Sequence, residues 1–481
     1  MQLVARLERI GLAFSSWTER WIPDSWIVCM GLTAVAFVLT WTGGGASIGD
    51  SLVAWGDGTW VLLELAMQFT LATIAAHACV SSPVVYGLFD RFARLPDPER
   101  PGQAVALLAA TSIAVSFVNW AVSVVGCALL AAFLCRRNPK ADIRLLAACS
   151  LLGMGTVWHG GLSGSAPLIL ATPGNPLLEP AIGSPIVDRL YPITETILIP
   201  FNLVYLLVVG LVAVVTAVCL HPTERAVTFS AEKLAAILPK PGSDAADASD
   251  ATGDVLDPAD LADADADLDR PARRIDSFRG WSWMAACLLL YPLGHSLATR
   301  GFGATWTINA YNTLFLALAL LLHPSPTSFL RACRDGVGPA WGIIVQFPFY
   351  AGIFGLIQNT GLGDWLGALF AAVASPESFN VVVYVYSAIM NLFVPSAGSK
   401  WLIEAPYLIP AANQAGVSTT SILLAYAYGD STTNLVQPFL AIPVLSILRM
   451  RFGEIAGYMM IISLPCFLVT LIAMALMPAG L

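Results

Sequence analysis

The stretch from residue 385 to residue 445 constrains this chain most, because it is strongly apolar and yet carries two clusters of polar residues and helix breakers. The first cluster is Pro395, Ser396, Gly398, Ser399 and Lys400, and the second is 429–434, with Pro438 just after it. In a bilayer, non-helical backbone persists only where protein covers it or where it lines a watery cavity, since every N–H and C=O group needs a partner. Two such interruptions in tandem predict a re-entrant hairpin followed by a broken helix, an arrangement that secondary transporters use to build binding sites.

The composition places this stretch in a membrane protein. Hydrophobic residues make up 57% of the chain and charged residues 12%, whereas soluble domains carry about 25% charged residues. Apolar runs long enough to cross a bilayer recur from one end to the other. We therefore expect an all-α polytopic membrane protein in the plasma (inner) membrane, with the lipid bilayer as its surroundings.

Charge and cysteine content exclude several kinds of partner. The net charge of −8 owes ten negative charges to Asp residues between 244 and 269, and removing those ten leaves +2, so no nucleic-acid partner is predicted. The nine Cys form no CxxC motif and no pairing with His, so we expect neither a disulfide framework nor a metal centre. No cofactor is predicted apart from a coupling ion, H⁺ or Na⁺.

Basic residues indicate which loops are cytoplasmic. On that basis each half of the chain is predicted to contain a span, an interrupted span, a hairpin, a broken helix and a further span, in that order. The first half starts on the cytoplasmic side of the membrane and the second half on the external side. This order predicts an inverted repeat of two five-element halves, with the substrate site between the hairpins and the broken helices. The chain is predicted to begin with a cytoplasmic amphipathic N-terminus at 1–24, followed by a first membrane repeat at 25–220 that contains hairpin 103–134 and broken helix 145–172. A cytoplasmic Asp/Ala-rich linker at 221–279 and a connecting span at 280–303 come next. The second membrane repeat at 304–481 contains hairpin 379–413 and broken helix 419–448.

The first hairpin is predicted from charge. Segment 103–134 has basic residues on both sides, Arg91 to Arg100 before it and Arg136 to Lys140 after it. Both flanks should be cytoplasmic, yet the segment is too short for two crossings of about 20 residues each. Two half-length helices with a tip near Ser116, Asn119 and Ser123 satisfy both conditions. The alternative is one long tilted helix with a basic flank on the wrong side, because the rule has exceptions.

Two further interruptions are expected in the spans that precede the hairpins. Segment 59–88 is interrupted at Ser81, Ser82 and Pro83, and segment 341–374 at Pro348, Gly361 and Gly363. The glycine-rich residues 43–57 are expected to form a loop.

Helix breaks supply the chemistry that an anion and a cation need. Freed N–H groups at the positive end of a half-helix hold an anion, and hydroxyl, amide and carbonyl oxygens coordinate Na⁺. The alternative for any one of these side chains is a hydrogen bond between helices, which is common in membrane bundles. Candidate sodium ligands are Asn119, Ser163, Ser399 and Thr433. The candidate substrate or ion contacts are Ser116, Asn119, Ser123, His159, Ser163, Ser165, Ser396, Gly398, Ser399, Lys400, Asp430, Thr432, Thr433, Asn434 and Gln437.

Two ionisable residues stand out, because such a group in a bilayer costs about 2.5–3.5 kcal/mol on insertion scales and is functional by default. Lys400 has three interpretations: it neutralises a substrate carboxylate, it pairs with Asp430 or Glu404, or it replaces a bound cation. Asp430 is either a proton carrier, a cation ligand or an ion-pair partner. His159 either titrates during transport or stays a neutral, hydrogen-bonded core residue.

The sequence lacks the motifs that mark several other classes of protein. The chain has no GxxxxGK[ST] loop, no HExxH motif and no GxSxG elbow. Energy must then come from ion or solute gradients, so a secondary carrier is predicted and an enzyme is not. A channel would usually have fewer spans per chain, and a membrane enzyme would need convergent catalytic residues, whereas the five His are dispersed.

Three segments resemble a known family: NLFVPSAGSKW at 391–401, NLVQPFLAIPVLSI at 434–447 and GMGTVWHGGLSGSAPLILATPGN at 153–175. They are similar to the short-chain fatty acid transporters, part of a wider ion-transporter-like group of inverted-repeat carriers. The order and spacing of the spans agree as well, so the resemblance covers nearly the whole chain.

The resemblance implies symport of a short monocarboxylate such as butyrate or acetoacetate with H⁺ or Na⁺. It also implies separate scaffold and transport domains and a homodimer that works by an elevator motion. The hairpin tip departs from the family pattern at Ala397 and Ser399, which the family fills with more glycine, and the residues YGDSTT before Asn434 have no match in it. These departures leave a carrier for a dicarboxylate or another organic anion as the alternative.

Overall fold

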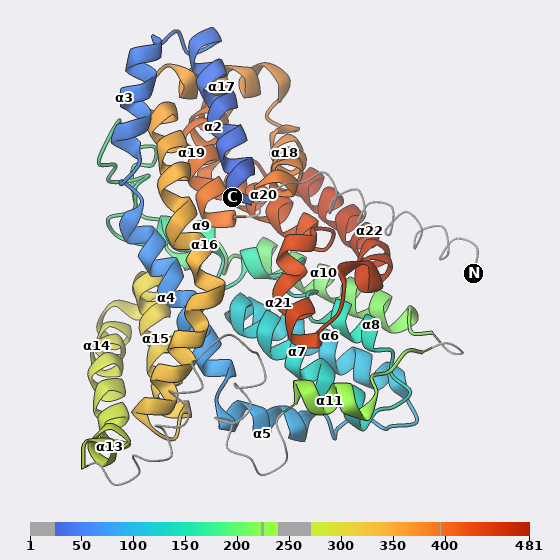
Figure 1. Ribbon diagram of the computed structural model, residues 1–481. Helices are drawn as coiled ribbons and strands as arrows, with labels where there is room; N and C mark the ends of the chain where they lie inside the picture. Colours follow the sequence, from blue (N-terminus) through green and yellow to red (C-terminus); the bar gives the residue numbers. More distant parts are fainter. Residues whose placement is uncertain (1–24, 223–225, 239–270, 395) are drawn as a thin grey trace.

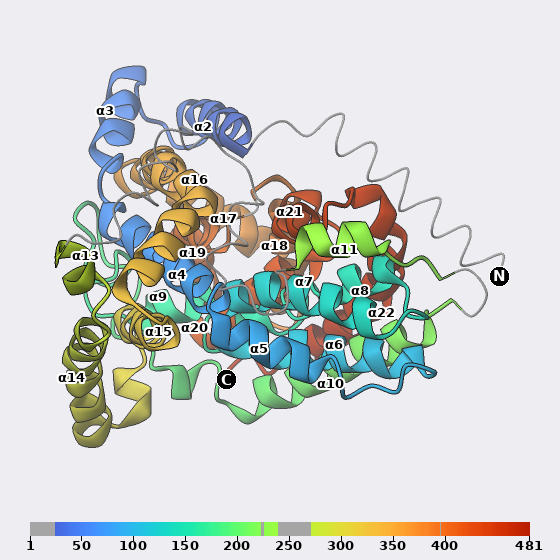
Figure 2. The same ribbon diagram turned by 60° about the horizontal axis from the view of Figure 1, so that its bottom comes forward.

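A computed structural model describes residues 25–222, 226–238, 271–394 and 396–481, and the part of the chain that it describes is helical without strands. The predicted amphipathic N-terminus at 1–24, the Asp-rich centre of the linker and Pro395 lie outside these residues. The long helices and the short broken ones are interleaved, with segments from both halves of the chain meeting in the middle (Figures 1 and 2).

The described residues contain six helices long and apolar enough to cross a membrane, which confirms a polytopic α-helical membrane protein. A seventh span is formed if a helix pair bent by 47° is counted as one crossing. The six are α4 (Leu63–Val80), α6 (Pro101–Val118), α7 (Trp120–Arg137), α10 (Pro200–Cys219), the Ala340–Asn359 part of α16 (Pro326–Asn359) and α22 (Phe452–Leu476).

The described part of the chain begins with α2 (Ser25–Thr42), which is followed by a helix that the sequence did not predict. Residues 43–57 were expected to be a loop, but most of them form α3 (Ile48–Gly58). Ser47 caps this helix by accepting a hydrogen bond from the Asp50 N–H. Gly58 of α3 lies so close to Gly355 of α16 that a Cβ on Gly58 would come within 2.8 Å of the Gly355 Cα. Two glycines thus let the two helices cross in close contact.

The first predicted interruption is present, and the second is present at Gly361 but not at Pro348 or Gly363. Helix α4 ends at Val80 and α5 (Pro83–Phe92) begins after two intervening residues, with Ser82 as its cap and Pro83 in its first turn. In the second half, α16 continues straight through Pro348, and the break falls at 360–361, before α17 (Leu362–Val373). Helix α16 also begins at Pro326, well before the predicted segment 341–374.

Segment 103–134 folds back on itself at Asn119. Helices α6 and α7 meet at this one residue, whose backbone is extended. The Ser123 hydroxyl of α7 donates to the Ser112 carbonyl of α6 at 2.9 Å, so the two helices run back along each other. The Asn119 side chain accepts from the Val122 N–H at 3.0 Å and starts the second helix. The single tilted helix is therefore the wrong alternative. The predicted half length is wrong as well, because α6 and α7 have 18 residues each and are long enough to cross a membrane.

The predicted broken helix at 145–172 is interrupted by a long non-helical stretch and not by a simple kink. Helix α8 (Ile143–Cys149) is followed by turns, a short 3-10 helix η1 (Trp158–Gly160), and α9 (Ser165–Ala171). The Leu162 N–H donates to the Phe117 carbonyl at 2.7 Å, so the non-helical stretch lies directly against the tip of the first hairpin. A second 3-10 helix, η2 (Ile193–Glu195), precedes α10.

The connection to the second half runs through α11 (Ala231–Ile237), α13 (Pro271–Asp276) and α14 (Gly280–Thr305). Helix α14 is kinked at Gly301, whose φ of 76° is left-handed. Helix α15 (Ile308–Leu322) then packs against α4 and α14. The lower left of Figure 1 shows α13, α14 and α15 together.

The second hairpin consists of α18 (Phe379–Phe393) and α19 (Ala397–Gln414). The hydroxyls of Tyr386 and Tyr407 lie 2.7 Å apart across it. The bent pair that follows is α20 (Thr419–Asn434) and α21 (Pro438–Leu448). Helix α20 packs along α18 and also contacts α19 and α9 (Figures 1 and 2).

A cluster of charges fastens α5 to α7 outside the spans. Asp90 accepts hydrogen bonds from Arg136 and Arg137 at 2.9 Å each, and it also pairs with Arg94. Burial alone would raise the pKa of Asp90, but the hydrogen bonds and charges of Arg137 and Arg94 lower it to about 2. This carboxylate is therefore charged at any physiological pH, and its contacts hold the basic end of α7 in place.

Candidate functional site

Three ionisable side chains that the sequence singled out meet in the interior. The Asp430 carboxylate of α20 lies 2.9 Å from the Lys400 ammonium of α19 and 3.0 Å from Nδ1 of His159 in η1. The side chains of all three are at most 1% exposed. Lys400 thus comes from the second hairpin, Asp430 from the second broken helix and His159 from the first. Of the three interpretations of Lys400, pairing with Asp430 is the one that the structure contains.

The hydrogen bonds of His159 fix its tautomer. Its Nε2 accepts from the Ala166 N–H at 3.1 Å and therefore carries no proton. The proton of the neutral ring is then on Nδ1, which donates to Asp430. Protonation of Nε2 would place two N–H groups opposite each other. The Nδ1–H of His159 thus orients the Asp430 carboxylate, and His159 is a buried, hydrogen-bonded residue in this structure.

Lys400 is held by a residue that the sequence analysis missed. Its ammonium donates to the carbonyl and to the hydroxyl of Ser387 on α18, at 3.0 Å each. The contact with Asp430 is an ion pair. The ammonium also lies 4.8 Å above the ring of Tyr426, a favourable position for a cation over an aromatic face. The Lys400 ammonium thus has all its polar contacts with residues of the hairpin and of the neighbouring helix α20.

Aromatic rings surround this charged cluster. Trp158 stacks on His159 with centroids 4.9 Å apart, and Trp401 lies 4.7 Å from the ring of Tyr426. The Tyr426 hydroxyl donates to the Ala397 carbonyl at the start of α19. These rings exclude water from the ion pair, which strengthens its attraction and raises the cost of leaving either charge alone.

The polar residues near the second break are joined by another residue that we missed. The Asn391 amide of α18 donates to the Asp430 carbonyl at 2.7 Å, to the Asn434 side chain at 2.7 Å and to the Thr433 hydroxyl at 3.0 Å. Gln437 donates back to the Asn391 carbonyl at 2.8 Å. One side chain of the hairpin therefore contacts the last turn of α20 at three points.

The break itself differs from the prediction. Thr432, Thr433 and Asn434 were expected in non-helical backbone, but α20 continues through Asn434 and the break covers only 435–437. The Thr432 and Thr433 hydroxyls donate to the carbonyls of Tyr428 and Gly429, four residues earlier, so both are satisfied inside the helix. Pro438, which cannot donate an N–H, then starts α21.

The predicted residues of the first hairpin and break form a separate group. The Ser163 hydroxyl accepts from the Trp120 N–H at 3.1 Å, beside Asn119. Ser123 bonds to Ser112 within the hairpin, while the Ser116 hydroxyl and the Asn119 amide nitrogen have no hydrogen-bond partner in the described part of the chain. Ser165 lies at the first residue of α9.

The four candidate sodium ligands belong to three different hydrogen-bonded groups. Asn119 and Ser163 lie at the first hairpin tip, Ser399 bonds to Ser396 at the second, and Thr433 bonds to Asn391. Within the described residues no hydrogen bond joins one group to another. Gly398 beside Ser399 is needed for packing, since a Cβ there would lie 2.9 Å from the Phe69 ring.

An apolar pocket lies beside the second break. It has a volume of about 270 Å³, and Thr432, Thr433 and Val436 form one wall. The facing wall comes from one side of α22, with Met460, Leu464 and Phe467 among its residues. Its mainly apolar lining suits a short acyl chain.

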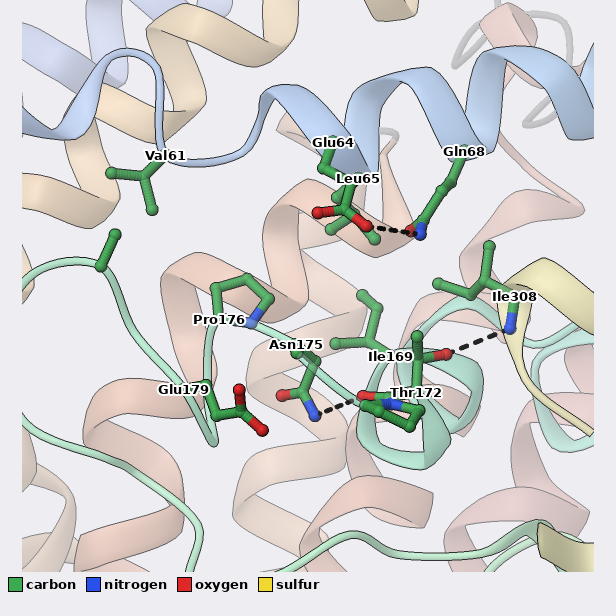
Figure 3. A pocket seen from close by; sticks show the side chains of 13 residues that line it. Val61, Glu64, Leu65, Gln68, Ile169, Thr172, Asn175, Pro176, Glu179 and Ile308 are labelled. Carbon is green, nitrogen blue, oxygen red and sulfur yellow. Dashed lines mark hydrogen bonds between the residues drawn. The ribbon is translucent and has the colours of Figure 1, made fainter. Parts of the chain in front are cut away.

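A second pocket of about 210 Å³ lies at the far end of α9 (Figure 3). Glu64 and Gln68 of α4 face it from one side, and Asn175 and Glu179 of the loop after α9 face it from the other. Glu64 accepts a hydrogen bond from Gln68 at 3.3 Å. Two carboxylates and two amides favour a cation over an anion here. Helix α9 connects this pocket, through Thr172, with His159, which bonds to Ala166 in its first turn.

Ser387 and Asn391 did leave a signal in the sequence. Polar residues of α18 occur at Asn380, Tyr384, Ser387 and Asn391, with spacings of four, three and four in an otherwise apolar run. That period is the polar face of a helix. It faces α20, to which Tyr384, Ser387 and Asn391 all bond.

Comparison with known proteins places the chain in a family. A family model described as short chain fatty acid transporter matches residues 6–477. A relative of Escherichia coli (strain K12), named as a short-chain fatty acid transporter, is 33% identical over 95% of this chain and 96% of its own length. A relative of Haemophilus influenzae with the same name is 30% identical over 97% of this chain and 99% of its own length.

Solved structures support the fold at lower sequence identity. The Alcanivorax borkumensis YdaH transporter superposes with a TM-score of 0.58 at 16% identity, covering 94% of this chain and 97% of its own. Neisseria gonorrhoeae MtrF, from a class of antimetabolite efflux pumps, superposes with a TM-score of 0.50 at 14% identity, covering 97% and 96%. The family match and the two full-length relatives show that this chain belongs to the short-chain fatty acid transporter family.

Proposed function

We propose that this protein is a secondary transporter of short-chain monocarboxylates, such as butyrate or acetoacetate, driven by a gradient of H⁺ or Na⁺. The buried Lys400–Asp430 pair, held between the second hairpin and the two broken helices, carries this proposal. Family membership supports the substrate class. The protein then belongs in the plasma membrane, where such a gradient exists.

The ion pair offers a way to bind a carboxylate without a permanently free cation. When the hairpin opens, the substrate carboxylate takes the place of Asp430 at the Lys400 ammonium. The charge of Lys400 then stays compensated throughout, whereas leaving it alone in the interior would be costly. The acyl chain would lie against apolar surface, for which the pocket between α20 and α22 and the rings of Trp158 and Trp401 are the candidates.

The number of buried cations favours a monocarboxylate over a dicarboxylate. Among the described residues, Lys400 is the one lysine or arginine whose side chain is buried. A second carboxylate at this site would therefore have no cation to neutralise it. The acidic pocket at the end of α9 suits the accompanying cation, since its two carboxylates favour positive charge. Ser163 and Asn119 at the first hairpin tip remain the alternative sodium ligands.

Uptake into proteoliposomes tests the substrate and the ion together. We expect labelled butyrate to accumulate under an imposed gradient of H⁺ or of Na⁺, but not under both, because one cation balances one anion. Butyric acid crosses bilayers unaided, so liposomes without protein and liposomes with a Lys400→Met variant set the background. Accumulation of succinate with no butyrate signal above background would instead establish the dicarboxylate alternative.

Orientation is tested by labelling two engineered cysteines. Lys140 and Ser184 are exposed and lie in loops that we propose to be cytoplasmic and external. The background should lack the two exposed native cysteines, Cys219 and Cys287. In intact cells an impermeant maleimide should label Ser184→Cys and leave Lys140→Cys unlabelled until the membrane is permeabilised. The reverse pattern would invert the proposed topology, including its cytoplasmic N-terminus.

We further propose that the protein is a homodimer in which a transport domain moves against a scaffold domain in an elevator motion. We also propose that the two halves of the chain are related as an inverted repeat. The two hairpins, α6–α7 and α18–α19, are the matching elements that support the repeat. Cross-linking of the purified protein in lipid would show the dimer directly.

A further inference from the structure

Tyr426 faces the buried ion pair from α20. It lies one turn before Asp430 and is completely buried. The Lys400 ammonium lies 4.8 Å from the centre of its ring, and the His159 ring meets it edge-on with centroids 5.6 Å apart. Because residues four apart share a helix face, Tyr426 and Asp430 present their side chains to the same group, the ammonium of Lys400.

The hydroxyl of Tyr426 is held by the tip of the second hairpin. It donates to the carbonyl of Ala397, which is the first residue of α19. A carbonyl inside a helix also accepts from the N–H four residues later, so Ala397 does not depend on this bond. The Tyr426 hydroxyl can therefore exchange Ala397 for another acceptor without leaving that carbonyl unsatisfied.

Two donors that suit a carboxylate are thus occupied by groups of the protein itself. The Lys400 ammonium faces Asp430 at 2.9 Å, and the Tyr426 hydroxyl bonds to Ala397. Ala397 and Lys400 lie within one turn of each other at the start of α19, so a movement of this end of the hairpin away from α20 breaks both contacts together. A carboxylate that enters between the two helices has two accepting oxygens, one for the ammonium and one for the hydroxyl.

A further donor beside Tyr426 lacks an acceptor. Trp401 follows Lys400 in the chain and is completely buried, and its ring centroid lies 4.7 Å from that of Tyr426. Its indole N–H has no hydrogen-bond partner in the described part of the chain. A buried donor without an acceptor is costly, and a carboxylate oxygen is an acceptor that would satisfy it. This unpaired donor favours an anion over a cation next to Tyr426.

We propose that Tyr426 is a second binding residue for the substrate, whose carboxylate accepts a hydrogen bond from the Tyr426 hydroxyl beside Lys400. This proposal rests on the proposed function and extends its binding site. In the closed state the Ala397 carbonyl occupies this hydroxyl, just as Asp430 occupies the Lys400 ammonium. Closure of the empty hairpin and binding of the substrate therefore compete for the same two donors.

The Tyr426→Phe variant tests the contact, because it removes the hydroxyl and keeps the ring beside Lys400. Hydrogen bonds to charged groups are among the stronger ones. We expect the KM for butyrate uptake into proteoliposomes to rise about tenfold to a hundredfold, with kcat within about threefold of wild type. Uptake of butyrate by Tyr426→Phe with the wild-type KM would overturn the proposal and leave the proposed function intact.

Tyr205→Phe is the matched control. Tyr205 is buried, and its hydroxyl is bonded to that of Thr470 at 2.9 Å, between α10 and α22. Its ring packs on Tyr428, which lies on the opposite side of α20 from Tyr426, since two residues along a helix turn by about 200°. This variant loses a buried hydroxyl as well, and its KM for butyrate should stay at the wild-type value.

Chain length separates a contact with the carboxylate from damage to the site. Acetate, propionate and butyrate share the head group and differ in the chain, so Tyr426→Phe should weaken their competition against labelled butyrate by the same factor. A structural defect has no reason to act equally on all three. A loss that changes with chain length would place Tyr426 at the acyl chain and overturn the proposal.

Replacement of Tyr426 by 3-fluorotyrosine keeps the hydroxyl and covers the case in which phenylalanine impairs folding. In fluorine NMR its resonance should shift when butyrate is added and stay in place with butyramide, which has the same chain but no charge. A shift with succinate and none with butyrate would support Tyr426 as a carboxylate contact and refute the monocarboxylate function. No shift with either acid would overturn the proposal.

Discussion

Asp430→Asn is expected to reduce substrate uptake by at least about a hundredfold. The substitution keeps the size of the side chain but leaves the Lys400 ammonium in the interior without a counter-charge. Removing one partner of a buried ion pair costs about 3–5 kcal/mol, and about 1.4 kcal/mol corresponds to a factor of ten. Asparagine has one acceptor oxygen and one NH2 group, so it cannot accept from both His159 and Lys400, which contact the two different carboxylate oxygens of Asp430. The hairpin and the two broken helices therefore lose their common contact.

Loss of fold and loss of function are separated by a double variant. Asp430→Leu combined with Lys400→Met removes both charges, and apolar replacements of a buried pair are often neutral or stabilising. We expect the double variant to regain the melting temperature that Asp430→Asn loses, but not to transport. Recovery of uptake in the double variant would show that the pair only stabilises the fold, and that Lys400 does not bind the substrate. Radiolabel uptake and thermal melting in detergent are the two measurements.

The sequence predicted the interruptions better than it predicted their shape. The turn at Asn119 and the break before Pro83 follow from residues with a strong local preference, an N-capping side chain and a proline. Pro348 misled the prediction, because α16 passes through it without a break in a long helix packed against α3 and α4. Tertiary contacts outweigh the local cost of a proline when neighbouring helices hold both halves in line.

The partners of the site could not be predicted, because they are distant in sequence. His159 and Asp430 are separated by 271 residues, and no local pattern specifies that they meet. Lys400 and Asp430 were recognised individually, since ionisable residues in an apolar run are conspicuous. Ser387 and Asn391 were missed because a serine or an asparagine alone does not stand out, although their spacing along α18 marks a polar face. Glu404 was considered only as a partner of Lys400, which turns out to be fully engaged elsewhere.

The second large effect is expected at Asn391, which links the hairpin to the broken helix. Its amide reaches the Asp430 carbonyl, the Thr433 hydroxyl and the Asn434 side chain within 3.0 Å. Asn391→Ala leaves these acceptors without their donor at the helix break, whereas the bond from the Gln437 amide goes to the backbone carbonyl of residue 391 and stays. Each buried polar group left unsatisfied costs about 1–3 kcal/mol, so we expect uptake to fall by about tenfold to a hundredfold, using about 1.4 kcal/mol for each factor of ten.

Asn380→Ala is the matched control for Asn391→Ala, because both asparagines are buried on the same helix. The Asn380 amide donates to the Met477 carbonyl at 3.3 Å, at the other end of α18 and away from the ion pair. If Asn391 acts by positioning Asp430, its variant should lose far more uptake than Asn380→Ala at a similar loss of melting temperature. The KM for butyrate should rise as well, since a displaced Asp430 alters the site at which Lys400 exchanges partners. Equal losses of uptake in the two variants would reduce Asn391 to an ordinary packing contact, and the geometry of the break would then not control binding.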